Sequence, residues 1–237
     1  MTRQPRLWLV VLAVSLVWTV TGRADGLGQG AASVCRIPSH GGSGVVVFTE
    51  PGRTLLLTAG HLFAGAGRNR AILLDLPAPA SGPPQSPGVR LLCLDERADL
   101  ALLELAAGPV PFVAPVATAP RRGAWSVGFD EMAAPAVIRP AHEVSTGELR
   151  TTTLERPWHG RSGGALLSDS GELVGICSAY TGPSDHREVE EPFRGVYSSQ
   201  QAIVVFWERC RSGGGTPQPF HDLKSPPWPA VPFLRPG

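Results

Sequence analysis

Short apolar runs of four to six residues, bounded by glycine, proline or aspartate, recur along the first half of this chain. They include GVVVF, TLLLT, AILLDL, VRLLCL and LALLEL, at residues 44–48, 54–58, 71–76, 89–94 and 100–105. Runs this short and this rich in Val, Ile and Leu are typical of β-strands, because an amphipathic helix would have to sustain its period over about ten residues or more. The pattern therefore predicts an all-β fold with many turns.

The same pattern continues in the second half of the chain. Further strands are predicted at Ala124–Phe129, Ala136–Arg139, Glu143–Arg150, Ala165–Leu167 and Glu172–Tyr180. The Pro- and Ala-rich stretch Pro109–Pro120 predicts a linker between the halves, and Pro77–Pro87 predicts a surface loop, because proline interrupts strand pairing. Thr181–Gly195 is charged and contains proline, which predicts another loop. Ser199–Cys210 is the one segment that predicts a helix.

Both ends of the chain differ from the part between them. Residues 1–24 carry Arg3 and Arg6, then a 14-residue uncharged apolar run, then small residues, which is the order of a secretory signal peptide. The alternative is a retained membrane anchor, although a spanning helix needs about 20 apolar residues. Residues 211–237 are rich in Gly and Pro and predict a flexible tail. We therefore expect an exported protein, secreted or periplasmic, with a folded domain at residues 25–210; it would contact a membrane only if the N-terminal segment is retained.

The composition argues against some partners and cofactors. Of 237 residues, 17% are charged and the net charge is +1, so the basic face that nucleic acids require is not indicated. Four cysteines, Cys35, Cys93, Cys177 and Cys210, permit disulfides in an exported protein, but three pairings are possible. Alternatively, Cys93 and Cys177 are buried free thiols, because both lie in apolar runs. No cysteine or histidine spacing suggests a zinc site, and no metal or other cofactor is expected.

The strongest chemical signal is the octapeptide HGRSGGAL at residues 159–166. Glycines on both sides of Ser162 permit a tight turn that exposes the hydroxyl and lets backbone N–H groups approach a substrate carbonyl oxygen. The N–H groups of Gly160 and Ser162 are the expected oxyanion hole. The G-x-S-x-G spacing also matches the nucleophile elbow of α/β-hydrolases, and a Gly-rich hairpin loop without chemistry is a third interpretation.

Chain order separates these interpretations. An α/β-hydrolase places its acid and then its His after the Ser, but only 75 residues follow Ser162 and the last 27 are Pro- and Gly-rich. The opposite order is available, because His61 ends an apolar strand and Asp99 begins another. Asp75 and Asp95 are weaker candidates for the acid, since Asp95 lies in a polar turn and Asp75 lacks the matching flank. An imidazole with the ordinary pKa of about 6.5 can act as a general base near neutrality.

The segments TAGH, DLALL and GRSGGAL, at residues 58–61, 99–103 and 160–166, resemble the three triad motifs of trypsin-like serine proteases. The compact bacterial branch, which includes the high-temperature-requirement periplasmic proteases, is the most similar. SGVVVF, GAWSVGF and GELVGICSAY match supporting segments in the same order, so the resemblance spans about residues 31–207. It implies two six-stranded antiparallel β-barrels, at about 31–108 and 121–207, with a C-terminal helix and a Pro-rich tail.

The resemblance also implies a mechanism and a substrate. Ser162 would attack a scissile carbonyl, His61 would take and later return the proton, and Asp99 would orient the imidazole. The predicted function is hydrolysis of peptide bonds in a polypeptide substrate by an exported serine endopeptidase. Two alternatives stay open: a binding module that keeps the fold without turnover, and a serine esterase, which the motif order disfavours.

In this family the substrate pocket is shaped by the residues before the nucleophile and by the strand after it. The matching residues here are Arg156, His159, Ser178 and Tyr180. If Arg156 lined the pocket floor, an acidic substrate side chain would be preferred, and a surface position for Arg156 is equally open. Digestive members have an Asp before the nucleophile, which pairs with a new N-terminus on activation. Arg161 occupies that position here, so activation by N-terminal insertion is not expected.

Overall fold

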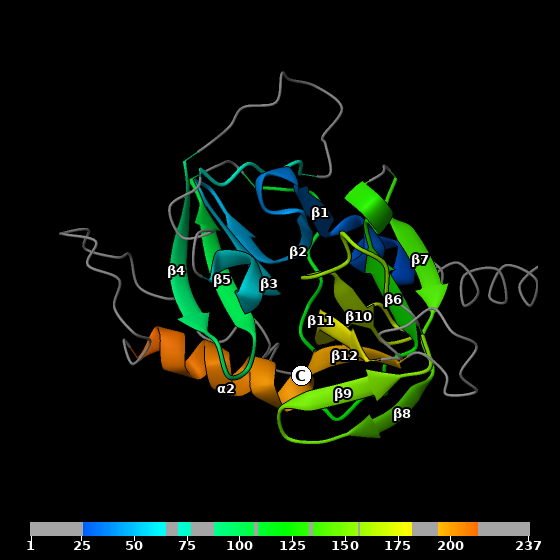
Figure 1. The fold of residues 1–237 in the computed structure, drawn as a ribbon. Helices are drawn as coiled ribbons and strands as arrows, with labels where there is room; N and C mark the ends of the chain where they lie inside the picture. Colours follow the sequence, from blue (N-terminus) through cyan, green and yellow to red (C-terminus); the bar gives the residue numbers. More distant parts are fainter. Residues whose placement is uncertain are drawn as a thin grey trace, which may run out of the picture.

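The apolar runs form strands that pair antiparallel in two sheets lying side by side (Figure 1). The computed structural model describes residues 26–64, 71–76, 88–106, 109–132, 135–155, 157–181 and 194–212. The predicted leader at residues 1–24 lies outside these ranges, as do the loop Pro77–Pro87 and residues 213–237 of the predicted tail. The chain passes from the first sheet to the second through residues 109–124, which include the predicted linker.

The first sheet has five strands in the order β1-β2-β3-β5-β4. Their bounds are Val34–Ile37 (β1), Gly42–Glu50 (β2), Arg53–Ala59 (β3), Val89–Asp95 (β4) and Leu100–Leu105 (β5). Every residue of β3 and β5 is buried, because each face of these strands meets its own apolar cluster. Leu55 and Leu57 belong to one cluster and Leu56 to the other. A continuous apolar run, rather than an alternating one, is what a strand covered on both faces requires.

The second sheet has seven strands in the order β7-β6-β10-β11-β12-β9-β8. Their bounds are Trp125–Gly128 (β6), Val137–Pro140 (β7), Glu143–Thr146 (β8), Arg150–Thr153 (β9), Ala165–Leu167 (β10), Leu173–Thr181 (β11) and Arg194–Ser199 (β12). One apolar cluster joins the two sheets and includes Val45 of β2, Val127 of β6 and Ile176 of β11. Because the two sheets share a core, their relative position is fixed. Side chains on loops of the first sheet therefore lie at fixed distances from side chains on loops of the second.

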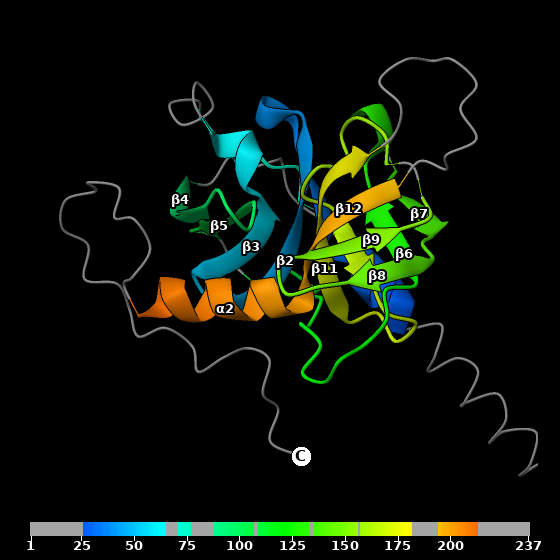
Figure 2. The ribbon, with the colours of Figure 1, turned by 60° about the horizontal axis from the view of Figure 1, so that its bottom comes forward.

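Helix α2 (Gln200–Arg211) follows β12 directly and runs along the first sheet (Figure 2). Ser199 caps its N-terminus, since the Ser199 hydroxyl accepts a hydrogen bond from the Ala202 N–H at 3.1 Å. Phe206 and Trp207 are buried in the shared core. The helix therefore begins at the end of a strand of the second sheet and packs across the border between the first and second sheets. None of the helices in the described part of the chain combines the length and hydrophobicity needed to cross a bilayer.

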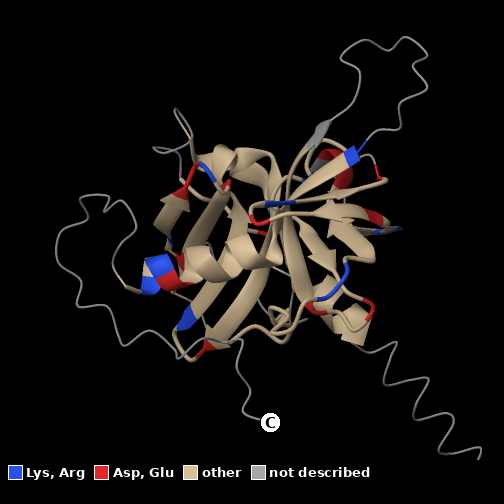
Figure 3. Ribbon diagram, turned by 90° about the horizontal axis from the view of Figure 1, so that it is seen from below, with Lys and Arg blue, Asp and Glu red and all other residues tan. Residues whose placement is uncertain are grey.

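The C-terminal end of α2 is attached to β4. Cys210 forms a disulfide with Cys93, 117 positions earlier in the chain. Beside it, Arg209 pairs with Asp95 of β4. Figure 3 shows basic residues at this end of the helix, where they also complement the helix dipole. The sequence allowed three disulfide pairings, and the structure contains Cys93–Cys210. The alternative prediction that Cys93 is a free thiol is therefore wrong.

The predicted all-β class, the two antiparallel halves and the C-terminal helix are confirmed. The described strands divide as five and seven rather than six and six. Ala71–Leu76 was predicted as a strand, but it makes only an isolated bridge, between Asp75 and Arg36. Ile72, Leu74 and Leu76 are half-buried against an apolar cluster of the first sheet, but among the described residues the backbone of this segment pairs only at that bridge, so it does not form a strand.

Three further segments differ from prediction. Glu143–Arg150 is not one strand but the first part of a hairpin, because the chain turns at Gly147, whose N–H donates to the Arg150 carbonyl oxygen at 2.8 Å. Residues 26–32, for which the sequence predicted no helix, are helical. Strand β1 was not predicted, and β12 begins inside the predicted loop Thr181–Gly195; residues 182–193 of that loop lie outside the described residues.

We expect loss of the Cys93–Cys210 disulfide to lower the free energy of unfolding by about 2–4 kcal/mol, because this bond closes a long loop and restricts the unfolded chain. Urea unfolding with and without reductant measures the effect. The double variant Cys93→Ala/Cys210→Ala is the matched control and should not respond to reductant. Equal stability of the oxidised and fully reduced wild type would contradict the prediction.

Candidate active site

His61 lies where β3 ends, at the border between the two sheets. A short 3-10 helix, η2 (Gly60–Phe63), follows Ala59 directly, so the chain turns away from the sheet at this point. The His61 side chain is 45% exposed, whereas the strand before it is wholly buried. An apolar strand thus brings an accessible imidazole to the edge of the core.

Asp99 lies in the turn before β5, with its backbone in the left-handed region at φ 52°. This conformation is strained for a residue other than glycine and persists only where the surroundings hold it. The second sheet holds the turn: Arg150 Nη1 and Ser198 Oγ both donate to the Ala98 carbonyl oxygen, each at 2.6 Å. The position of the Asp99 carboxylate therefore depends on contacts between the sheets.

The Asp99 carboxylate is buried and accepts hydrogen bonds from both sheets. The His61 N–H donates to Oδ1 at 2.6 Å, and His61 Nδ1 lies 3.0 Å from Oδ2. The hydroxyl of Ser178, in β11, donates to the same Oδ2. Burial alone would raise the pKa of Asp99, but the hydrogen bonds from His61 and Ser178 outweigh it and hold this pKa below its usual value. The carboxylate stays ionised and fixes Nδ1 on its side of the ring, which places Nε2 on the opposite side.

Ser162 lies in the loop that leads into β10, and two glycines shape this loop. Gly160 has φ 93° and Gly163 has φ 85°, both in the left-handed region that favours glycine. A Cβ atom on Gly163 would lie 2.0 Å from the Ser43 carbonyl oxygen. The G-R-S-G pattern is therefore a steric requirement of the way this loop packs against the first sheet.

The Gly160 N–H belongs to a peptide group that is fixed from outside the loop. The carbonyl oxygen of that peptide, from His159, accepts a hydrogen bond from the Glu131 N–H at 2.5 Å. In a trans peptide the C=O and N–H point in opposite directions. The Gly160 N–H therefore points away from Glu131.

The Ser162 N–H is oriented by the same principle. Its peptide carbonyl, from Arg161, accepts from the Gly164 N–H at 2.7 Å. In the part of the chain that the structure describes, neither the Ser162 N–H nor the Gly160 N–H donates to another protein group. Two backbone donors are thus held beside Ser162 with no acceptor of their own.

Ser43, in β2, holds the Ser162 loop from the first sheet. Its N–H donates to the Ser162 carbonyl oxygen and its hydroxyl donates to the Gly160 carbonyl oxygen, each at 2.7 Å. The Phe129 N–H donates to the Ser43 hydroxyl at 3.2 Å. The sequence interpretation gave Ser43 no functional role. Its position between two glycines inside an apolar strand was the available signal, because glycine in a strand marks the close approach of another backbone.

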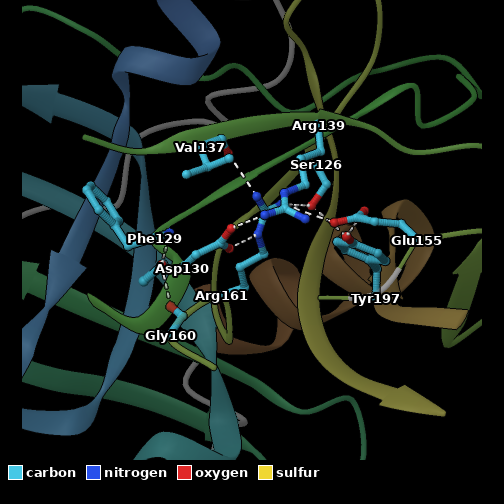
Figure 4. A network of polar contacts seen from close by, with 10 residues as sticks. Ser126, Phe129, Asp130, Val137, Arg139, Glu155, Gly160, Arg161 and Tyr197 are labelled. Atoms are coloured by element: carbon cyan, nitrogen blue, oxygen red, sulfur yellow. Dashed lines mark hydrogen bonds and ion pairs between the residues drawn. The ribbon is translucent and has the colours of Figure 1, made fainter. Parts of the chain in front are cut away.

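Arg161, next to Ser162, is buried within the second sheet, and Figure 4 shows its polar neighbours. Its guanidinium contacts the carboxylates of Asp130 at 2.5 Å and Glu155 at 3.0 Å. Burial raises the pKa of Glu155, and the hydrogen bonds from Ser126 and Tyr197 and the charge of Arg161 only partly oppose this. The loop that carries Ser162 is therefore anchored through a buried cation on one side and through Ser43 on the other.

A cavity of about 220 Å³ opens at the border between the sheets. It is lined by Gly41, His61, Leu62, Pro157, Trp158, His159, Gly160, Ser162, Cys177 and Ala179. His61 and Ser162 thus face one shared space. Among the described residues no hydrogen bond joins the Ser162 hydroxyl to the imidazole, and such contacts often tighten only when substrate is bound.

The predicted substrate-contacting residues have different positions. His159 lines the cavity. Ser178 instead directs its hydroxyl to Asp99, and its neighbours Cys177 and Ala179 line the cavity in its place. Arg156 and the side chain of Tyr180 lie outside the described residues. Over the ranges that the structure describes, no group of three or more His, Cys, Asp and Glu side chains is arranged to hold a metal ion.

Comparison with known proteins identifies a family and a fold. A family model described as a trypsin-like peptidase domain matches residues 42–176. The structure is similar to that of a serine endoprotease from Yersinia pestis, with a TM-score of 0.61 and 20% identity over 81% of this chain and 68% of that one. It is also similar to an inactive serine-to-alanine mutant of Rv3671c from M. tuberculosis H37Rv, with a TM-score of 0.56 and 16% identity over 81% of this chain and 92% of that one. A search among curated proteins finds no significant match.

Replacing Ser178 by alanine removes a hydrogen bond to a buried carboxylate. We expect the pKa of Asp99 to rise and the free energy of unfolding near neutrality to fall by about 1.5–3 kcal/mol, the usual contribution of a hydrogen bond to a charged group. A carboxyl group whose pKa is lowered by folding stabilises the protein above its unfolded-state pKa, and this stability is lost as the pH falls through the folded-state value. The difference between wild type and Ser178→Ala, measured by urea unfolding, should therefore shrink as the pH falls below 3.8.

Ser33→Ala is the matched control for this experiment. The Ser33 hydroxyl is also buried, but it donates to an uncharged acceptor, the Gly30 carbonyl oxygen, at 2.6 Å. Its loss should destabilise the protein by the same amount at every pH. A pH-independent effect of Ser178→Ala would argue against an ionised, hydrogen-bonded Asp99.

Proposed function

Because this chain belongs to the family of trypsin-like peptidase domains, we propose that it is a serine endopeptidase with His61, Asp99 and Ser162 as its catalytic triad. The family model covers residues 42–176, more than half of the 237 residues. The observation that carries the proposal is that His61 and Ser162 line one cavity while Asp99 is hydrogen-bonded to the His61 imidazole.

In the proposed reaction, the Ser162 hydroxyl oxygen attacks the carbonyl carbon of the scissile peptide bond. His61 Nε2 accepts the hydroxyl proton and then delivers it to the leaving amine nitrogen, which releases the first product and leaves an ester on Ser162. Water, deprotonated by the same nitrogen, hydrolyses this ester and restores the hydroxyl. The ionised Asp99 stabilises the imidazolium that forms at each step.

The negative charge that develops on the carbonyl oxygen needs donors that are already in position. The N–H groups of Gly160 and Ser162 are the candidates, because both peptide groups are fixed through their carbonyl oxygens and neither N–H has another acceptor among the described residues. In a comparable protease, losing one such donor lowered kcat by about 10²–10³-fold. The two donors would therefore supply a large part of the rate enhancement.

Export of the protein is part of the same proposal. The leader-like residues 1–24 support it. The Cys93–Cys210 disulfide supports it as well, because disulfides persist in oxidising compartments outside the cytoplasm. A secreted or periplasmic location follows if the leader is cleaved, and a membrane-anchored one if it is retained.

Labelling with a fluorophosphonate probe tests the nucleophile directly. The purified protein should take up about one probe per chain, and Ser162→Ala should take up none, because the probe reacts with an activated serine. Peptide hydrolysis by Ser162→Ala should fall by up to about 10⁶-fold in kcat. Ser145→Ala, which changes an exposed serine of β8, is the matched control and should label like the wild type.

Each other result of this experiment favours a different function. A folded protein that takes up no probe would be a binding module with the fold of a peptidase. Labelling that persists in Ser162→Ala would identify another nucleophile. If the protein takes up the probe and hydrolyses esters but no peptide, it would be an esterase.

The cavity beside Ser162 predicts an apolar residue before the cleaved bond. Its described lining contains no Asp, Glu, Lys or Arg and includes Pro157, Cys177 and Ala179. An unpaired charge in such a space is disfavoured, so a peptide library should show Ala, Val or Leu preferred over Lys, Arg, Asp and Glu by about tenfold or more, equivalent to about 1.4 kcal/mol. Ala179→Asp should shift the preference toward Lys and Arg. A wild-type preference for Asp or Glu would contradict this prediction and point to Arg156.

A further inference from the structure

Arg161, directly before the proposed nucleophile, has a side chain that is 1% exposed. All three of its nitrogen atoms donate hydrogen bonds: Nε to Asp130 at 2.5 Å, Nη1 to Ser126 at 2.6 Å and to Glu155 at 3.0 Å, and Nη2 to the Val137 carbonyl oxygen at 3.1 Å. Ser126 and Val137 come from β6 and β7, Asp130 from the turn after β6, and Glu155 from the segment after β9 (Figure 4). A buried cation without such partners would be prohibitively unstable, so Arg161 is held in one position within the second sheet.

Asp130 connects this charge to the backbone near the oxyanion site. It begins the 3-10 turn η4 (Asp130–Met132), in which Glu131 has φ 49° and ψ 28°. A non-glycine residue in this left-handed region is strained and persists only when its surroundings hold it. Asp130 accepts hydrogen bonds from Arg161 on one carboxylate oxygen and from Arg139 on the other, at 2.6 Å. These two cations fix the start of the strained turn.

The strained residue orients the oxyanion peptide. The Glu131 N–H donates to the His159 carbonyl oxygen at 2.5 Å. This contact keeps the carbonyl turned away from the site, and because the peptide is trans it keeps the Gly160 N–H turned the opposite way. If the turn relaxed, the carbonyl would lose its donor and the peptide would be released to rotate.

We propose that the Arg161–Asp130 pair is an internal latch that keeps the His159–Gly160 peptide oriented for binding the oxyanion. The proposal rests on the proposed serine peptidase function. Arg161 and Asp130 are positioning residues, since neither lines the cavity. Both belong to the second half of the folded chain, so the latch closes on folding and needs no cleavage of the chain.

Asp130→Asn and Glu155→Gln form a matched pair of variants for testing the latch. Each replaces a carboxylate that contacts Arg161 with an uncharged amide of the same shape, but only Asp130 adjoins Glu131. In the full-length protein, Asp130→Asn should lower kcat and the rate of fluorophosphonate labelling by about 10²-fold, the usual effect of losing one oxyanion donor, with KM changed less than about twofold. Glu155→Gln should stay within about threefold of the wild type, because its carboxylate has no contact with the strained turn.

Equal effects of the two variants would overturn the latch, because they would show a general role of the buried charges in stability. Arg161→Met would leave two buried carboxylates without their cation, so its effect on stability would mask any effect on the latch. The double variant Asp130→Asn/Glu131→Gly adds a rescue, because glycine adopts the left-handed conformation without strain. The double variant should be labelled about tenfold faster than Asp130→Asn. No recovery would overturn the role assigned to Glu131.

Hydrogen exchange separates failure of the latch from failure of the proposed function. The Glu131 amide, which donates to the His159 carbonyl oxygen, should exchange faster in Asp130→Asn than in the wild type and in Glu155→Gln. This measurement does not require activity. If the wild type takes up no fluorophosphonate, the proposed function fails while the exchange result still tests the latch, and unchanged exchange in Asp130→Asn overturns it.

Discussion

A single buried carboxylate connects the two sheets to the site between them. Asp99 carries a charge that burial would disfavour, so it requires donors, and these come from both halves: His61 from the first sheet and Ser178 from the second. The strained turn that presents Asp99 is itself held by Arg150 and Ser198 of the second sheet. The imidazole is therefore oriented only when both sheets have folded and docked, which makes formation of the site a consequence of forming the shared core.

Much of this arrangement could be predicted from the sequence because it depends on local rules. Continuous apolar runs predicted β2, β3, β4 and β5 of the first sheet, and in β3 and β5 the runs are continuous because both faces are covered. Chain order singled out His61, Asp99 and Ser162, and the structure brings His61 against Asp99 and into one cavity with Ser162. Failures followed where apolar content did not determine backbone pairing: residues 71–76 pack alternate side chains on the core but pair only at one bridge, and a glycine divides the segment that begins at Glu143.

The contacts that hold the site in place could not be predicted, because each depends on register and on the docking of distant segments. Ser43 and Ser178 are single hydroxyls in strands, and the residues around them do not indicate that Ser43 contacts the loop of Ser162 or that Ser178 contacts Asp99. The partner of Cys93 was undetermined for the same reason, since four cysteines allow three pairings. Such side chains gain their roles only once strands from both halves lie next to each other.

The residue before Ser162 is a cation, Arg161, where the digestive trypsin-like proteases have an aspartate, and the surrounding residues of this fold neutralise that charge. A cation at this position cannot pair with a positively charged chain end, and here Arg161 is enclosed by the carboxylates of Asp130 and Glu155. Stability alone does not account for this, because replacing a buried ion pair with apolar side chains of similar volume is often neutral or stabilising. A leucine could fill the space, but it could not fix the direction of a neighbouring carboxylate. The planar guanidinium has donors at fixed angles, and that directionality is what transmits the position of Asp130 to the strained backbone at Glu131. We therefore infer that the Arg161–Asp130 pair serves to fix backbone geometry beside the proposed nucleophile rather than to raise the free energy of unfolding.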